Sequence, residues 1–147
     1  MRLTSYTNYS LRILMYCALQ QGRLVTIPEV ADAFGISRAH LLKSARHLGQ
    51  LGYLRTVRGR NGGIELARAP EAISVGAAIR DLEDTGEFVE CFNPSRNQCR
   101  IAGPCRLTGL LRRGLEGFYR ELEDSTLADL VADEAALRDR LALVEVA

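Results

Sequence analysis

The sequence predicts a mainly α-helical chain with one small β-hairpin and a long helix in its C-terminal part. Apolar residues recur at helical spacing over most of the chain, and a long amphipathic pattern begins at Arg106. Two short strand-like runs flank a glycine-rich turn at positions 58–63. With 147 residues, 47% of them hydrophobic, the chain can bury a core without disulfide bonds.

The first two helices are predicted from apolar spacing and capping residues. The first runs from Tyr9 to Gln20, and its expected buried positions are Leu11, Leu14, Met15 and Ala18. Thr26 and Glu29 then have the spacing of a capping box, with a proline between them in the first turn. A short second helix is therefore expected to end at Gly35.

A third helix is expected from Arg38 to about Leu51, capped by Ser37. Its buried stripe is predicted to consist of Leu41, Leu42, Ala45 and Leu48. Two short helices joined by a turn that contains glycine form a helix-turn-helix. The strands predicted next, Tyr53 to Val57 and Ile64 to Leu66, form a hairpin directly after this unit.

The hairpin has a basic, glycine-rich tip, where glycine permits positive φ angles and close approach to a groove. Such a tip alone could be a solvated turn, but after a helix-turn-helix it predicts the wing of a winged DNA-binding domain. The third helix would enter the major groove and the wing the flanking minor groove. The candidate DNA-binding residues are Ser37, Arg38, His40, Lys43, Arg58, Arg60 and Asn61.

The C-terminal half is predicted to hold a helix from Val75 to Asp84 after the Ser74 cap, an irregular loop, and a long helix from Arg106 to Glu123. The long helix has more apolar surface than a small domain covers, which indicates either a dimer seam or internal packing; these residues are Leu107, Leu110, Leu111, Leu115 and Phe118. A last helix is expected from Ser125 to about Val144. The predicted units are residues 1–84 (DNA binding), 85–105 (cysteine loop) and 106–147 (dimerisation helix and C-terminal helix).

Charge is distributed unevenly behind a net charge of +1. From Arg38 to Arg68 there are seven basic residues and one acid, Glu65, whereas eight acids follow from Glu121 onward. A basic face for a polyanion explains this pattern, and so does a solvated charged surface. No apolar run approaches the roughly 20 residues of a membrane span, and the N-terminus lacks the pattern of a signal peptide, so a cytoplasmic protein is expected.

Cys91, Cys99 and Cys105 lie in or beside the irregular loop, and their spacing is not that of a zinc knuckle or a thioredoxin-like pair. Thiolates favour iron–sulfur clusters, zinc or copper(I), so an iron–sulfur cluster, a zinc ion and metal-free thiols all remain open. Cys105 begins a helix, where an anionic thiolate is stabilised. Cys17 lies in an apolar helix and is interpreted as a core residue.

The helix-turn-helix, the segment from Val57 to Ile64 and the cysteine loop together resemble bacterial iron–sulfur winged-helix regulators of the IscR type. The segments around Cys91 and Cys105, and Ser125 to Val131, are most similar to the nitric-oxide-sensing NsrR branch; similarity to RirA-type iron regulators comes second. The resemblance implies a homodimeric repressor that binds a double-stranded DNA operator. It implies a cluster on the three loop cysteines, four-iron (4Fe-4S) rather than two-iron (2Fe-2S), with nitric oxide as the signal.

The same resemblance indicates which residue would be the fourth ligand of the cluster, beside the three cysteines. One branch uses a histidine three residues after the last cysteine, where this chain has Thr108. Another uses an aspartate of the partner subunit, where this chain has Asn8, with Arg12 and Glu83 at the supporting positions. Asn8 is therefore the candidate fourth ligand. Glu87 and Glu90 are the alternatives within the loop.

The sequence leaves two alternatives to a DNA-binding regulator. An enzyme or electron carrier could use the same cluster, but the chain has no glycine motif for nucleotides, and its two histidines both fall on the third helix. We therefore expect no enzymatic activity. A metal-free winged-helix interaction module would be colourless, so an absorption spectrum separates it from a cluster protein.

Overall fold

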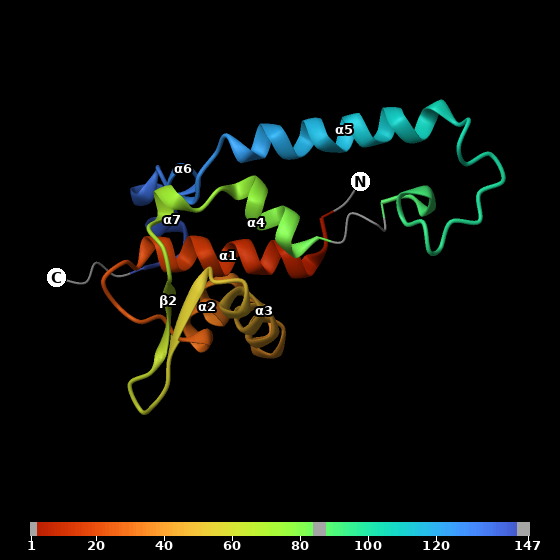
Figure 1. Cartoon of the computed structure of the whole chain (residues 1–147). Helices are drawn as coiled ribbons and strands as arrows, with labels where there is room; N and C mark the ends of the chain where they lie inside the picture. Colours follow the sequence, from red (N-terminus) through yellow and green to blue (C-terminus); the bar gives the residue numbers. More distant parts are fainter. Residues whose placement is uncertain (1–2, 84–87, 144–147) are drawn as a thin grey trace.

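The computed structural model describes residues 3–83 and 88–143. Figure 1 shows a compact N-terminal part, from which α5 and the cysteine loop extend to one side. The elements are α1 (Ser5–Leu19), α2 (Ile27–Phe34), α3 (Arg38–Gln50), β1 (Leu54–Val57), β2 (Gly63–Leu66), η1 (Pro70–Ala72), α4 (Val75–Leu82), η3 (Glu90–Phe92), α5 (Arg106–Glu123), α6 (Leu127–Leu130) and α7 (Glu134–Arg140). The predicted fold class, mainly α with a β-hairpin, is confirmed.

Capping residues determine where the first helices begin. α1 starts four residues before the predicted position, because the side chain of Thr4 accepts a hydrogen bond from the Thr7 amide at 3.1 Å. α2 begins with the predicted capping box: the amide of Thr26 donates to Glu29 Oε2 at 2.7 Å. Gly35 ends α2 in the left-handed conformation, with φ of 63°.

The hairpin pairs β1 with β2 in antiparallel register, from Leu54 opposite Leu66 to Val57 opposite Gly63. Val25 adds an isolated antiparallel bridge to Ile64 on the other side of β2. Gly63 permits this close approach, since a Cβ there would lie 2.6 Å from the carbonyl oxygen of Val25. Val25 thereby attaches β2 to the segment between α1 and α2.

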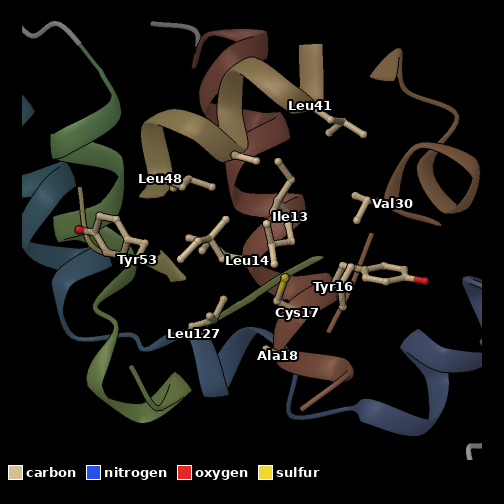
Figure 2. Packing of buried hydrophobic residues seen from close by; sticks show 14 of the residues in the cluster. Ile13, Leu14, Tyr16, Cys17, Ala18, Val30, Leu41, Leu48, Tyr53 and Leu127 are labelled. Atoms are coloured by element: carbon tan, nitrogen blue, oxygen red, sulfur yellow. The ribbon is translucent and has the colours of Figure 1, made fainter. Parts of the chain in front are cut away.

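The core lies where α1, α3, the hairpin and α6 meet, as Figure 2 shows for ten labelled side chains. Its fully buried large residues are Ile13, Leu14, Leu19, Leu41, Leu48, Ile73 and Leu127. The predicted stripe of α3 was wrong at one position: Leu42 is 57% exposed, and Ser44 is buried in its place. On α1, Leu11 and Met15 are only partly buried.

α5 packs against α4 at a glycine. A Cβ on Gly76 would lie 2.6 Å from the amide nitrogen of Glu123 and 2.8 Å from the carbonyl oxygen of Tyr119. Arg80 of α4 reinforces the contact, because its guanidinium binds two glutamates of α5 and lies 4.2 Å from the ring centre of Tyr119. The bounds of α5 are those predicted from the sequence.

The prediction of one continuous last helix was wrong. α6 ends at Leu130, and α7 begins four residues later with Asp133 as its cap, where the carboxylate accepts a hydrogen bond from the Ala136 amide at 3.2 Å. Asp favours caps over helix interiors because its side chain competes for backbone amides. Among the described residues no helix is long and apolar enough to cross a membrane.

Candidate functional site

The candidate DNA-binding residues of α3 are exposed. Ser37, Arg38, His40 and Lys43 all lie at the surface near the start of the helix, whereas Leu41 and Leu48 are buried. Ser37 occupies the cap position as predicted, but its side chain makes no capping hydrogen bond. The Ser37 hydroxyl therefore accepts no hydrogen bond from the backbone amides in the first turn of α3.

Two tyrosines of α1 support this surface, and the sequence analysis missed their role. The ring of Tyr9 stacks on His40 at 5.9 Å between ring centres. Tyr6 lies 5.8 Å from the ring of His47, and Lys43 Nζ lies 5.7 Å from the centre of the Tyr6 ring. The three-residue spacing of the tyrosines, which places them on one helix face, was the available signal.

The hairpin tip is also exposed, with Arg58, Arg60 and Asn61 at the surface. A groove of about 760 Å³ separates the hairpin from α3. The groove has basic, polar and apolar lining: Arg46 and Gln50 from α3, Arg58 from the hairpin, and Leu42 among the apolar side chains. Arg46 is exposed and belongs to the same basic surface, although the sequence analysis did not select it.

The three loop cysteines are free thiols, and each is partly buried. Cys91 lies in η3, where the hydroxyl of Thr108 donates to its Sγ at 3.4 Å. Cys105 is the cap residue of α5, and the amides of Thr108 and Leu107, with the Thr108 hydroxyl, lower the pKa of its thiol. Since the Cys105 side chain makes no capping hydrogen bond of normal geometry, we attribute this shift to the dipoles at the helix start.

Cys91 and Cys105 thus both lie near Thr108, while the structure does not bring all three thiols together. Among the described residues no group of three His, Cys, Asp or Glu side chains is close enough to hold a metal ion. Beside Cys91, the ring of Phe92 lies 4.7 Å from the Arg112 guanidinium of α5. The loop therefore rests on the first half of α5 through η3.

Cys17 is also a free thiol but differs from the loop cysteines in its burial. It is 3% exposed and lies among the core side chains in Figure 2. Burial raises the pKa of its thiol to about 12. A thiol in this environment stays protonated and apolar, as a core residue does.

The residues at the supporting positions contact other parts of the same chain. Asn8 is exposed in the second turn of α1. The guanidinium of Arg12 lies 5.5 Å from the ring centre of Phe34, and the Glu83 carboxylate accepts from the Thr4 amide at 2.7 Å. Of the alternative loop ligands, Glu90 is exposed at the start of η3, and Glu87 lies outside the described residues.

Comparison with known proteins identifies the family. The Rrf2 family, described as "Iron-dependent Transcriptional regulator", matches residues 3–133. The HTH-type transcriptional regulator NsrR of Halalkalibacterium halodurans is 48% identical over 144 residues, which is 97% of this chain and 99% of that protein. NsrR of Bacillus subtilis is 41% identical over 146 residues, 99% of this chain and all of that protein.

Solved structures agree on the fold. IscR of T. potens superposes with a TM-score of 0.73 at 23% identity, over all of this chain and 94% of that one. The oxidized form of Staphylococcus aureus CymR gives a TM-score of 0.68 at 27% identity, over 88% of this chain and 95% of that one. The chain therefore belongs to the Rrf2 family of winged-helix transcriptional regulators, which act by binding DNA and not as enzymes.

Proposed function

We propose that this chain is a homodimeric repressor whose affinity for DNA is set by an iron–sulfur cluster on Cys91, Cys99 and Cys105, with nitric oxide as the signal. The observation that carries this proposal is the set of three free, partly buried thiols on one loop beside α5. Thiolates are the usual ligands of such clusters, so the donor set fits the group. The names of the NsrR relatives support the same assignment.

A homodimer is supported by the uncovered apolar face of α5. Leu107 and Leu110 are 57% and 58% exposed, and Tyr119 is the only residue of the helix that is buried within the described chain. A second copy packed on this face would remove both leucines from water. The dimer would present its two α3 helices to successive major grooves of a palindromic operator.

On the DNA side, the exposed residues at the start of α3 would contact base edges and phosphates. Arg58 and Arg60 would enter the flanking minor groove, which attracts arginine where A·T pairs narrow it. The stacking of Tyr9 on His40 and the position of Lys43 over Tyr6 hold the α3 side chains against α1. A displacement of α1 would therefore also displace the DNA-binding face.

On the signal side, contacts within the chain connect the loop to this body. When bound, the cluster would supply iron that nitric oxide can attack. Cys91 and Phe92 hold η3 on α5 through Thr108 and Arg112, at 3.4 Å and 4.7 Å. α5 in turn is bound to α4 by Arg80. Release of the loop would free the first half of α5 and alter the helix pairing that sets the spacing of the two α3 helices.

The family description favours a second candidate, an iron- or redox-responsive regulator that uses the same thiols. The two candidates differ in signal and not in site. Nitric oxide would act on the loaded protein directly, whereas an iron-responsive regulator would change its DNA affinity when iron is withdrawn.

Anaerobic purification of the full chain, followed by absorption spectroscopy and native mass spectrometry, tests the cluster. Binding to a selected palindromic duplex is then measured before and after addition of nitric oxide or an iron chelator. Replacement of any loop cysteine by serine should abolish bound iron and sulfide, whereas Cys17→Ala should retain both. A colourless protein that binds DNA equally under all conditions would refute the proposal.

A further inference from the structure

Leu42 is a large apolar side chain exposed on the DNA-binding helix. It is 57% exposed although its neighbours Leu41 and Leu48 are fully buried. It lies four residues after Arg38 and four before Arg46, so the three side chains follow one another on one face of α3. Both arginines are exposed. The face therefore carries a leucine between two guanidinium groups.

The same leucine lines the groove between α3 and the hairpin, which also takes in Ile27 and Val57. Arg46 and Arg58 are the charged lining residues, and no acidic side chain lines the groove in the part of the chain that the structure describes. Outside the groove one acid lies beside this face, because Arg38 pairs with Asp32 at 3.8 Å. An apolar surface surrounded mainly by positive charge fits a ligand that combines negative charge with exposed apolar groups.

Duplex DNA offers this combination in its major groove. Its phosphates are negative, and the 5-methyl group of thymine is the one apolar substituent among the base edges there. The deep, narrow major groove of A-form RNA does not admit side chains, so double-stranded RNA fits the surface poorly. A leucine on a helix in the groove can contact thymine methyl groups while the flanking arginines reach phosphates or guanines.

We propose that Leu42 is a specificity-determining residue that recognises thymine 5-methyl groups in the operator. The proposal rests on the proposed DNA-binding role of α3 and adds a base preference to it. Arginine, histidine and lysine contacts alone favour guanine and phosphate, whereas Leu42 adds discrimination for A·T pairs within the major groove. Removing one buried methyl group weakens an apolar contact by about 0.8 kcal/mol, which is about fourfold in affinity.

The test uses a duplex selected from a random library by the full-length protein. Each thymine is then replaced in turn by deoxyuridine, which removes only the 5-methyl group. The parent protein should lose about fourfold in affinity at one or two positions in each half-site. Leu42→Ala should bind the thymine duplex more weakly and show no further loss at those positions. Gln50→Ala, which alters another exposed side chain of the same groove, should keep the sensitivity to deoxyuridine.

Several outcomes would overturn the proposal. Equal sensitivity of the parent and Leu42→Ala to deoxyuridine would show that another residue contacts the methyl group. Unchanged affinity of Leu42→Ala for every duplex would show that the leucine does not contact DNA. If the parent enriches a duplex but ignores the methyl groups, only this inference fails. If it enriches no duplex at all, the DNA-binding role of α3 fails with it.

Discussion

Replacing Gly76 by alanine should destabilise the junction between α4 and α5. The added Cβ would lie 2.6 Å from the Glu123 amide nitrogen and 2.8 Å from the Tyr119 carbonyl oxygen. Both are backbone atoms and cannot rotate away as a side chain would, so the two helices must separate. This displacement also strains the contacts of Arg80 with α5. The Arg80 side chain is 37% exposed, so these ion pairs contribute little on their own.

The magnitude follows from two opposing effects. Alanine in place of glycine favours the helix by about 1 kcal/mol, whereas overpacking a tight contact typically costs about 1–3 kcal/mol. We expect the backbone clash to prevail and to leave a net destabilisation of up to about 2 kcal/mol. For a chain of this length that corresponds to a fall in Tm of up to roughly 8 °C.

Thermal unfolding followed by circular dichroism at a fixed protein concentration measures the change. Gly109→Ala on α5 is the matched control: its Cβ would meet only the end of the Arg113 side chain, at 3.6 Å. It should leave the Tm unchanged or raise it slightly through helix propensity. An equal or higher Tm for Gly76→Ala would refute the argument from close helix packing.

Three further predictions concern the core, the hairpin and the fourth ligand of the proposed cluster. Ser44→Ala should leave the free energy of unfolding in denaturant unchanged or raise it by up to about 1 kcal/mol, because Ser44 Oγ is buried without a described hydrogen-bond partner. A fall in the free energy of unfolding of more than about 1 kcal/mol would show that Ser44 has a hydrogen-bond partner. Arg60→Ala should weaken operator binding by about 1–3 kcal/mol, and the double variant Arg58→Ala/Arg60→Ala should reduce the salt dependence of DNA binding. Unchanged affinity of the double variant would show that the hairpin does not contact DNA. Asn8→Asp should lengthen the lifetime of the visible absorption of the cluster in air, because a carboxylate is a better ligand for iron than an amide. If the absorption of Asn8→Asp and of Asn8→Ala decays at the same rate as that of the parent protein, position 8 does not contact the cluster.

Local sequence determined most of the secondary structure. The capping box of Thr26 and Glu29, the left-handed Gly35 and the bounds of α5 all follow from residues within a few positions of one another. The hairpin likewise follows from two short strand-like runs around a glycine-rich turn. The burial of Cys17 was also predicted, because its apolar helical setting is local information.

Only the tertiary structure decided which helix faces meet. Leu42 has the same chemistry as Leu41, and only the placement of α1 and the hairpin around α3 leaves one exposed and the other buried. The contacts of Tyr6 and Tyr9 with α3 join residues far apart in the chain, and helical periodicity carries no information about partners at that distance. The same reason applies to Cys91: the spacing of the cysteines indicates a shared loop, whereas the approach of Cys91 to Thr108 depends on how that loop folds back on α5. Cys105 lies near Thr108 only because it caps the same helix three residues earlier.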